Sequence, residues 1–338
     1  VLAAALRAGG FAPAELEWCT AALCNSRLAL SGGMRPGDTI EPYHDRVRET
    51  VVARLEPKVR VDWHRRLAVA FEELSAADRG TVDAELLAVH WRGAGERERA
   101  RHYFFRAAGE AEQVLAFGRA ARLYRLGLEL SGEGAADTRA LRVKLGDALA
   151  NAGRGGEAAA AYLAAVADQA GAGDDGRRED LELQRRAAEQ YLRSGYFDEG
   201  LRALATVLES VGMSIPKTPM RALLSLLLRR AQIGLRGLAF KARPASEIDA
   251  DALIRIDICW TASIGFGMAD LVRGNDFQTR QLLLALRAGE PYRVAKALAV
   301  EAGYLGTIGK PGLRNTGRVL GAARAVAERL QHPHALGL

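Results

Sequence analysis

Three stretches of the chain repeat the same order of glycine, small and bulky residues. In each, an apolar run ends at a glycine, a small residue follows five positions later, and a bulky residue comes four positions after that. The glycines are Gly95, Gly153 and Gly195, the small residues are Ala100, Ala158 and Gly200, and the bulky residues are Phe104, Tyr162 and Leu204. A glycine can end a helix in the left-handed conformation, and a small residue lets a second helix approach the first. The pattern therefore predicts antiparallel helical hairpins.

This order of residues is typical of tetratricopeptide repeats, each of which is one pair of helices. The copies are unevenly spaced, and an additional helix is expected over 117–130. Only 6% of the residues are aromatic, and alanine, the best helix former, is abundant. We therefore expect an all-α fold, a tetratricopeptide-like α-solenoid; the alternative is a set of unrelated amphipathic helices in an Ala-rich chain. A leucine at Ala158 should force two helices apart, whereas Ala161 should tolerate one.

Residues 1–75 predict a different, smaller module. Helices are expected over 2–7, 14–24, 45–55 and from Asp62 onward, with short extended runs at 27–30 and 39–43. Two helices, a strand, a loop and a second strand form the plan of a winged-helix domain with a short β-hairpin. The remaining chain is expected to divide into tetratricopeptide-like repeats over 76–212, a basic apolar connecting helix over 213–247 and further helical repeats over 248–338.

The later helices are expected over 249–272, 275–287, 291–308 and 314–331, with another beginning at 335. That last helix has no capping pattern, and the first residue is Val rather than Met. We therefore expect the chain to be a truncated segment of a longer protein.

Several short runs resemble one known kind of protein. They are Tyr-His-Asp-Arg-Val-Arg-Glu at 43–49, His-Arg-Arg-Leu-Ala at 64–68, Phe-Gly-Arg-Ala-Ala-Arg-Leu-Tyr at 117–124, Phe-Gln-Thr-Arg at 277–280 and Leu-Ala-Leu-Arg-Ala-Gly-Glu at 284–290. Together they resemble the winged-helix and tetratricopeptide-repeat segment of large bacterial proteins. Those proteins join a serine/threonine protein kinase to a predicted AAA-type signal-transduction ATPase. The resemblance implies a nucleotide-binding core that binds ATP or ADP upstream of residue 1.

The resemblance also implies a role for His44 as a nucleotide-phosphate sensor in the intact protein. A histidine at a helix N-terminus can donate a hydrogen bond to a phosphate, and the helix end itself favours an anion. The alternative is that His44 only caps its helix and packs under the wing.

No enzyme motif accompanies these features. The nearest approach to a phosphate-binding loop, residues 306–312, has Pro311 in place of the hydroxyl residue that holds magnesium, and Gly265-Phe-Gly267 lacks the third glycine of a dinucleotide site. The three cysteines and six histidines follow no metal-ligand spacing. We therefore expect no catalytic residue, metal or cofactor here. The segment should instead be a non-catalytic, regulatory one that binds a protein partner and contacts the upstream nucleotide-binding core.

The net charge is +6, and much of the excess lies between residues 217 and 243. No acidic residue occurs between Glu209 and Glu247, and a basic helix is expected over 220–240. One interpretation is an anionic membrane or nucleic-acid contact. The other is a half-buried connecting helix whose arginines extend to solvent. We expect no specific nucleic acid, since acidic residues alternate with the basic ones near the N-terminus. No signal sequence or transmembrane segment is expected, which favours the cytoplasm.

Overall fold

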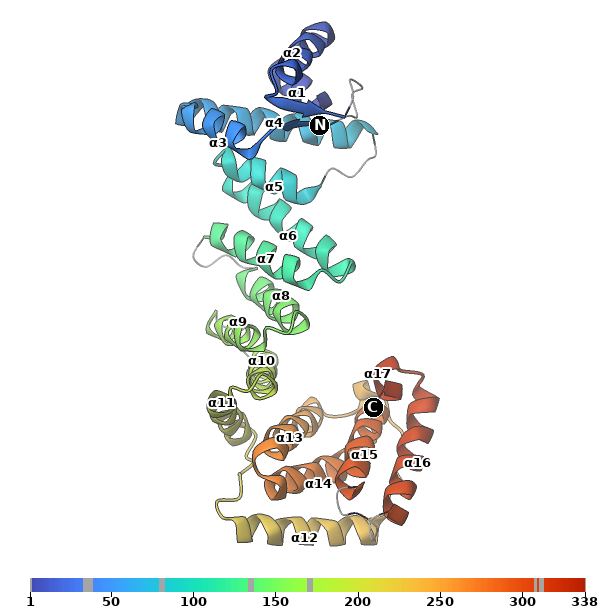
Figure 1. Cartoon of the computed structure of the whole chain (residues 1–338). Coiled ribbons are helices and arrows are strands. Elements are labelled where there is room, and N and C mark those ends of the chain that lie inside the picture. Colours follow the sequence, from blue (N-terminus) through green and yellow to red (C-terminus); the bar gives the residue numbers. More distant parts are fainter. Residues whose placement is uncertain are drawn as a thin grey trace. The chain divides into compact units, whose positions relative to one another are not determined.

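The structure is a computed structural model that describes residues 2–32, 39–78, 83–132, 137–168, 173–306, 309 and 313–337 (Figure 1). The described residues form 17 α-helices, one short 3₁₀ helix and one sheet of two strands. The expected all-α class is confirmed. The chain divides into two compact units, 1–152 and 153–338, which we call unit 1 and unit 2. The four-part division expected from the sequence stays a prediction.

Unit 1 begins with short elements and continues as a series of helices. Its elements are α1 (Leu2–Gly9), α2 (Pro13–Asn25), β1 (Ala29–Ser31), β2 (Ile40–Pro42), α3 (Asp45–Arg54), α4 (Pro57–Asp78), α5 (Ala84–Gly93), α6 (Arg97–Gln113), α7 (Phe117–Leu130) and α8 (Thr138–Asn151). The strands pair antiparallel with Leu30 opposite Glu41, and the turn expected between them lies largely outside the described residues. α1 packs on α4, and α4 to α7 each pack on the next helix.

The predicted start of α4 is wrong. Asp62 does not cap a helix but lies inside α4, where its carboxylate pairs with Arg66 at 2.8 Å. The helix begins at Pro57, because proline has no N–H to leave unpaired in the first turn and its φ already suits a helix. In the sequence pattern Pro57 marks the end of the helix expected over 45–55, but in the structure it is the first residue of α4.

Two histidines form one of the polar contacts between α4 and α5. The Nδ1 atoms of His64 and His90 are 3.1 Å apart, so one ring donates a hydrogen bond to the other. A Cβ on Gly93 would lie 2.5 Å from the His64 ring, so the glycine admits this ring against α5. Burial, with a smaller contribution from His64, lowers the pKa of His90 to about 4.

Acid should therefore destabilise unit 1 through His90. The folded pKa, about 4, lies below the ordinary value of 6.5, so the stabilising contribution is complete above pH 6.5 and is lost as the pH falls towards 4. We expect the free energy of unfolding to decrease more steeply over this range in the wild type than in a His90→Gln variant. Chemical denaturation at a series of pH values measures the difference, and parallel profiles would contradict the prediction.

Unit 2 consists of helices and one short 3₁₀ turn, η1. Its elements are α9 (Gly155–Ala167), α10 (Asp174–Arg193), α11 (Phe197–Ser210), α12 (Pro219–Arg236), η1 (Ala245–Glu247), α13 (Ala250–Ala269), α14 (Leu271–Ala288), α15 (Pro291–Gly306), α16 (Leu313–Leu330) and α17 (Pro333–Gly337). Three pairs pack closely, α10 with α11, α13 with α14 and α15 with α16. α10 also contacts α9 and α13, α14 contacts α15, and α12 lies against α14 (Figure 1).

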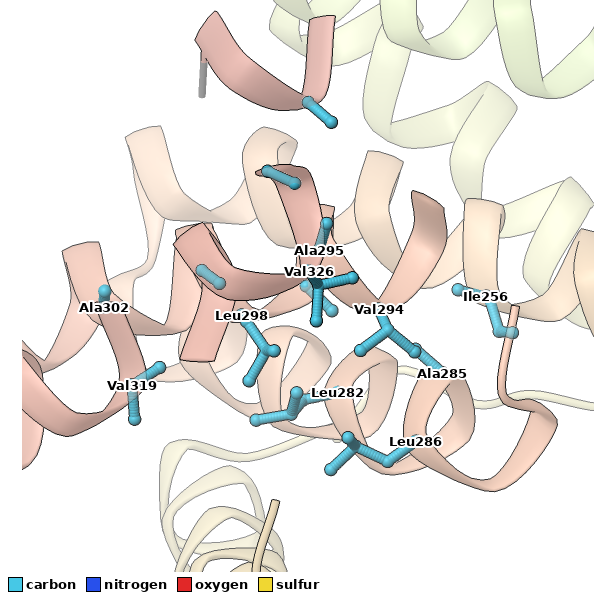
Figure 2. Close-up of a cluster of buried hydrophobic side chains, with 14 residues drawn as sticks. Ile256, Leu282, Ala285, Leu286, Val294, Ala295, Leu298, Ala302, Val319 and Val326 are labelled. Carbon is cyan, nitrogen blue, oxygen red and sulfur yellow. The ribbon is translucent and has the colours of Figure 1, made fainter. Parts of the chain in front are cut away.

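Two apolar clusters hold these pairs together. One joins α13, α14, α15 and α16 and includes Leu282, Val294, Leu298 and Val319 (Figure 2). The other joins α10, α11, α13 and α14 through residues such as Leu192, Leu204, Ile258 and Phe277. Both α13 and α14 contribute to the two clusters, so these two helices are central to the unit.

Several predicted boundaries in unit 2 are wrong. The predicted helix 249–272 is interrupted at Asp270, whose carboxylate accepts hydrogen bonds from the backbone N–H of Val272 and Arg273 and so caps α14. The helix predicted to reach residue 240 ends at Arg236, because Gly237 adopts a φ of +71°. A loop is also predicted over 171–176, but α10 already begins at Asp174.

Candidate functional site

The three repeat glycines lie where one helix ends and the next begins. Gly95, Gly153 and Gly195 have φ values of +79°, +75° and +85°, which a glycine adopts without strain. After α5 the backbone N–H of Glu96 bonds to the Trp91 carbonyl at 3.0 Å, and after α10 Tyr196 N–H bonds to the Tyr191 carbonyl at 2.9 Å. These bonds satisfy carbonyl groups that a helix end otherwise leaves unpaired.

The other repeat positions are buried. This holds for Ala100, Phe104, Ala158, Tyr162, Gly200 and Leu204. A Cβ on Gly200 would lie 2.6 Å from Leu192 Cγ, so only glycine permits the approach of α11 to α10 there. The expectation for Ala161 is wrong, because Ala161 is only 8% exposed. Ala160 is an exposed position on α9, so a leucine would meet solvent there instead.

One hairpin turn has no glycine and escaped the sequence analysis. Between α6 and α7, Leu115 takes the left-handed conformation with a φ of +58°, and Ala116 N–H bonds to the Ala111 carbonyl at 2.8 Å. The geometry is that of the turns at Gly95 and Gly195. Leucine carries no sequence signal for it, because this conformation is unfavourable for a residue with a side chain.

His44 occupies the N-cap of α3. The His44 backbone is extended, the residue is exposed to solvent, and its side chain makes no capping hydrogen bond. The alternative that the His44 side chain caps the helix and packs under the wing is therefore wrong. The role of His44 as a phosphate sensor stays a prediction.

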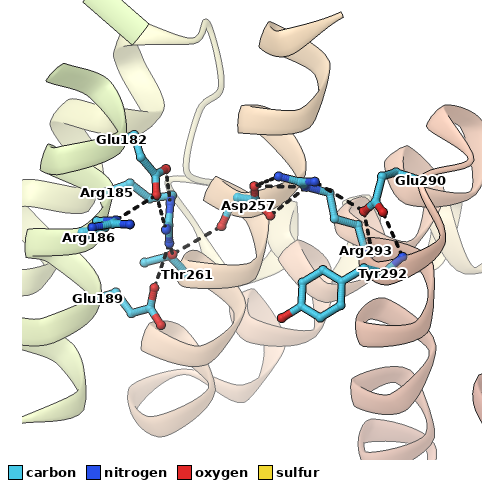
Figure 3. Close-up of polar contacts among 9 residues, drawn as sticks. All are labelled: Glu182, Arg185, Arg186, Glu189, Asp257, Thr261, Glu290, Tyr292 and Arg293. Carbon is cyan, nitrogen blue, oxygen red and sulfur yellow. Dashed lines mark hydrogen bonds and ion pairs between the residues drawn. The ribbon is translucent and has the colours of Figure 1, made fainter. Parts of the chain in front are cut away.

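The richest array of charged side chains lies on α10, α13 and α15 (Figure 3). Arg185 of α10 donates hydrogen bonds to Glu182 and Glu189 of its own helix, at 2.7 Å each, and to Thr261 Oγ1 of α13 at 2.8 Å. Burial opposes the charge on Arg185, but the two glutamates outweigh it and raise its pKa. Arg185 thus joins α10 to α13.

A second set of contacts joins α13 to α15. Arg293 binds the Asp257 carboxylate through Nε at 3.1 Å and also pairs with Glu290 at 3.3 Å. Glu290 in turn accepts hydrogen bonds from the backbone N–H of Tyr292 at 3.0 Å and of Arg293 at 2.8 Å, and so caps α15. The charges are balanced within the array, as is needed where side chains are largely withdrawn from water.

Lys296 differs from the other cations of this surface. Its Nζ lies 3.7 Å from the centre of the Trp260 ring, and it makes no ion pair with the residues that the structure describes. Burial lowers the pKa of Lys296 to about 8, although Glu189 and Asp257 act in the opposite direction. We call Arg185, Asp257, Trp260, Arg293 and Lys296, on α10, α13 and α15, the charged face.

The charged face consists of ion pairs, hydrogen bonds and one contact between a cation and an aromatic ring. Within the described ranges no cluster of His, Cys, Asp and Glu could hold a metal ion, and the three cysteines are free thiols. The half-buried ammonium of Lys296 over an aromatic ring is instead suited to receiving a carboxylate. Sequence reasoning missed these residues, because they lie up to 111 positions apart and follow no local motif.

The basic residues of α12 also behave differently from expectation. Arg229 and Arg230 do not extend to solvent: Arg229 pairs with buried Asp276 at 3.1 Å, and Arg230 pairs with buried Glu301 and donates to Asn275 Oδ1 at 2.5 Å. Burial raises the pKa of Glu301, while Arg230 acts to lower it. These ion pairs attach the helix to α14 and α15.

The glycine pair that resembled part of a dinucleotide site has a packing role. A Cβ on Gly274 would lie 2.7 Å from the backbone nitrogen of Gly267, so α13 and α14 touch there through backbone atoms. α13 is also the one helix in the described part of the chain that is long and apolar enough to cross a membrane, and half of that stretch is buried inside the protein. A core helix has the same properties, so this is weak evidence for a span.

Compared with known proteins, the chain matches no family model and no curated protein.

Proposed function

We propose that this chain is the non-catalytic protein-interaction segment of a signalling kinase or ATPase, with its helical pairs arranged as a tetratricopeptide-like solenoid. The observation that carries the proposal is the charged face, which collects polar side chains from three successive helical pairs on their first helices. A surface built from several repeats suits an extended peptide, because each repeat contributes separate contacts along its length. Upstream, the winged-helix module would link this solenoid to the nucleotide-binding core.

Lys296 is the residue through which a partner would be recognised. Its ammonium has an aromatic ring below it and no ion pair among the described residues, so a partner carboxylate would complete its contacts. A hydrogen bond to a charged group contributes about 1.5–3 kcal/mol, or roughly a tenfold change in affinity or more. Since the pKa of Lys296 is about 8, binding should weaken as the pH rises through that value.

Selection of a displayed random-peptide library on the 338-residue chain tests this proposal. We expect it to enrich acidic peptides that bind a Lys296→Ala variant at least about tenfold more weakly. Arg324→Ala is the matched control, because Arg324 is an exposed cation of α16 whose side chain is 79% accessible. Enriched peptides that bind the Lys296→Ala variant as well as the wild type would refute the charged face as the binding surface.

The second candidate function is nucleotide sensing by His44. The exposed, uncapped His44 side chain at the start of α3 favours it. In a longer protein that includes the nucleotide-binding core, His44→Ala should reduce the ADP retained through purification. Unchanged ADP content would leave protein interaction as the function.

A further inference from the structure

The strongest unexplained surface of the molecule is the outer side of α12. The helix lies along the edge of unit 2 with α14 on one side (Figure 1). Its large apolar residues on the other side are between 41% and 91% exposed. We call them the α12 ridge: Met220, Leu223, Leu224, Leu227, Leu228 and Leu235.

The α12 ridge is an exposed apolar stripe, although Leu226 and Ile233 of the same helix are half-buried against the protein. Positions 220, 224, 227, 231 and 235 form one stripe at helical spacing, and this stripe faces solvent. The side that packs on the protein carries Ala222, which is buried, together with Arg229 and Arg230 and their ion pairs. A continuous exposed apolar stripe of this kind marks an interaction site rather than the normal scatter of surface leucines.

The charges around the ridge are all of one sign. From residue 210 to residue 246 the chain has no carboxylate side chain. Arg229 and Arg230 are neutralised inside the protein, and the Arg236 guanidinium donates a hydrogen bond to the Leu286 carbonyl of α14 at 2.9 Å. Three further cations are exposed near the two ends of the helix: Lys217 and Arg221 at its start and Lys241 beyond its end.

Because the charges of this segment are all positive, they distinguish between two candidate partners of the α12 ridge, a second copy of this chain and an anionic lipid surface. A second copy of this chain would bring these cations against the same cations, with no carboxylate of the segment to pair with them, and such a contact is repulsive. An anionic lipid surface satisfies both features, since leucines enter the boundary of the acyl chains while lysine and arginine contact the headgroup phosphates. Because α14 holds the helix along its length, the whole stripe can meet one flat surface.

We propose that the α12 ridge docks the protein on an anionic membrane surface, with the helix parallel to the membrane plane. The site takes phospholipid headgroups of negative charge through Lys217, Arg221 and Lys241, and the acyl boundary through the leucines. This function is independent of peptide binding at the charged face, because it uses neither Lys296 nor Trp260.

Flotation of the full 338-residue chain with phospholipid vesicles tests the proposal. The wild type should bind phosphatidylcholine vesicles that contain phosphatidylserine, and bind pure phosphatidylcholine vesicles much more weakly. Each of Lys217→Ala and Lys241→Ala should reduce binding about fivefold, and added salt should reduce it further. Leu227→Asp should abolish binding, while Leu320→Asp on α16 should leave it unchanged.

The two leucines form a matched pair, since Leu227 is 57% exposed and Leu320 is 55% exposed. Both variants should retain the wild-type circular dichroism and melting midpoint, which separates lost binding from lost folding. Absence of wild-type binding to the phosphatidylserine vesicles would overturn the proposal, as would equal loss in both leucine variants. Light scattering that shows a dimer dissociated by Leu227→Asp would also overturn it and assign the ridge to a second copy. Binding that depends on the lysines but not on Leu227 would refute insertion of the ridge.

Discussion

Replacing Asp276 with alanine should lower the free energy of unfolding of unit 2 by about 3–5 kcal/mol. Asp276 is 0% exposed and accepts a hydrogen bond from Ser225 at 2.6 Å. It pairs with Arg229 at 3.1 Å and with Arg280 at 2.8 Å. Without the carboxylate, two largely buried guanidinium groups keep their charge and lose their counter-ion. Removing one partner of a buried ion pair destabilises a protein more than replacing the whole pair with apolar residues.

Urea denaturation followed by circular dichroism measures the effect of Asp276→Ala. The control is Asp175→Ala, because Asp175 also pairs with an arginine at 3.0 Å but its side chain is 97% accessible. An ion pair at that exposure contributes about 0–1 kcal/mol. Asp276→Asn should give an intermediate loss, since the amide keeps an acceptor for Ser225 but not the charge. A loss for Asp276→Ala as small as that of the control would show that the cluster does not hold α12 on α14.

Replacing Phe277 with alanine should also cost about 3–5 kcal/mol of unfolding free energy. The ring is 0% exposed and stacks on Phe266, with ring centres 5.7 Å apart and an angle of 11° between the planes. The Arg280 guanidinium lies 4.6 Å from the centre of the same ring. Removing the ring leaves a cavity in the cluster that joins α10, α11, α13 and α14, where close packing permits only partial collapse.

The melting midpoint and the denaturant midpoint of Phe277→Ala both report this loss. Leu235→Ala is the control in the same unit, because Leu235 is 91% exposed and its truncation should change stability by less than about 0.5 kcal/mol. A loss for Phe277→Ala below about 1 kcal/mol would mean that the cluster is loosely packed and that α14 is not central to unit 2.

Most helices were predictable from the sequence, but their ends were predictable only where a local signal exists. Pro57 and Asp270 show the difficulty. Proline and aspartate are both common at helix starts. The spacing of apolar residues alone, however, does not show where one helix ends and the next begins. The turn at Leu115 had no signal at all, because its backbone adopts a left-handed conformation that leucine does not prefer.

The candidate site was much less predictable than the fold. His44 could be selected from a short motif, since its position at a helix start is a local property. The charged face could not, because Arg185, Asp257 and Arg293 meet only when three helices are packed together. Likewise, the basic character of residues 217–243 was visible in the sequence, but the inward direction of Arg229 and Arg230 was not.

Helix propensity and backbone freedom belong to individual residues, so the helical class and the left-handed turns at Gly95, Gly153 and Gly195 could be predicted from the sequence. The buried side of α12, in contrast, depends on contacts with residues far away in the sequence. That helix carries leucines on both sides, so its hydrophobic pattern permits either orientation. The choice depends on Asp276 and Glu301, which are 47 and 71 residues away from their arginine partners. Buried carboxylates require cations, so α12 turns Arg229 and Arg230 inward and leaves most of its leucines in solvent.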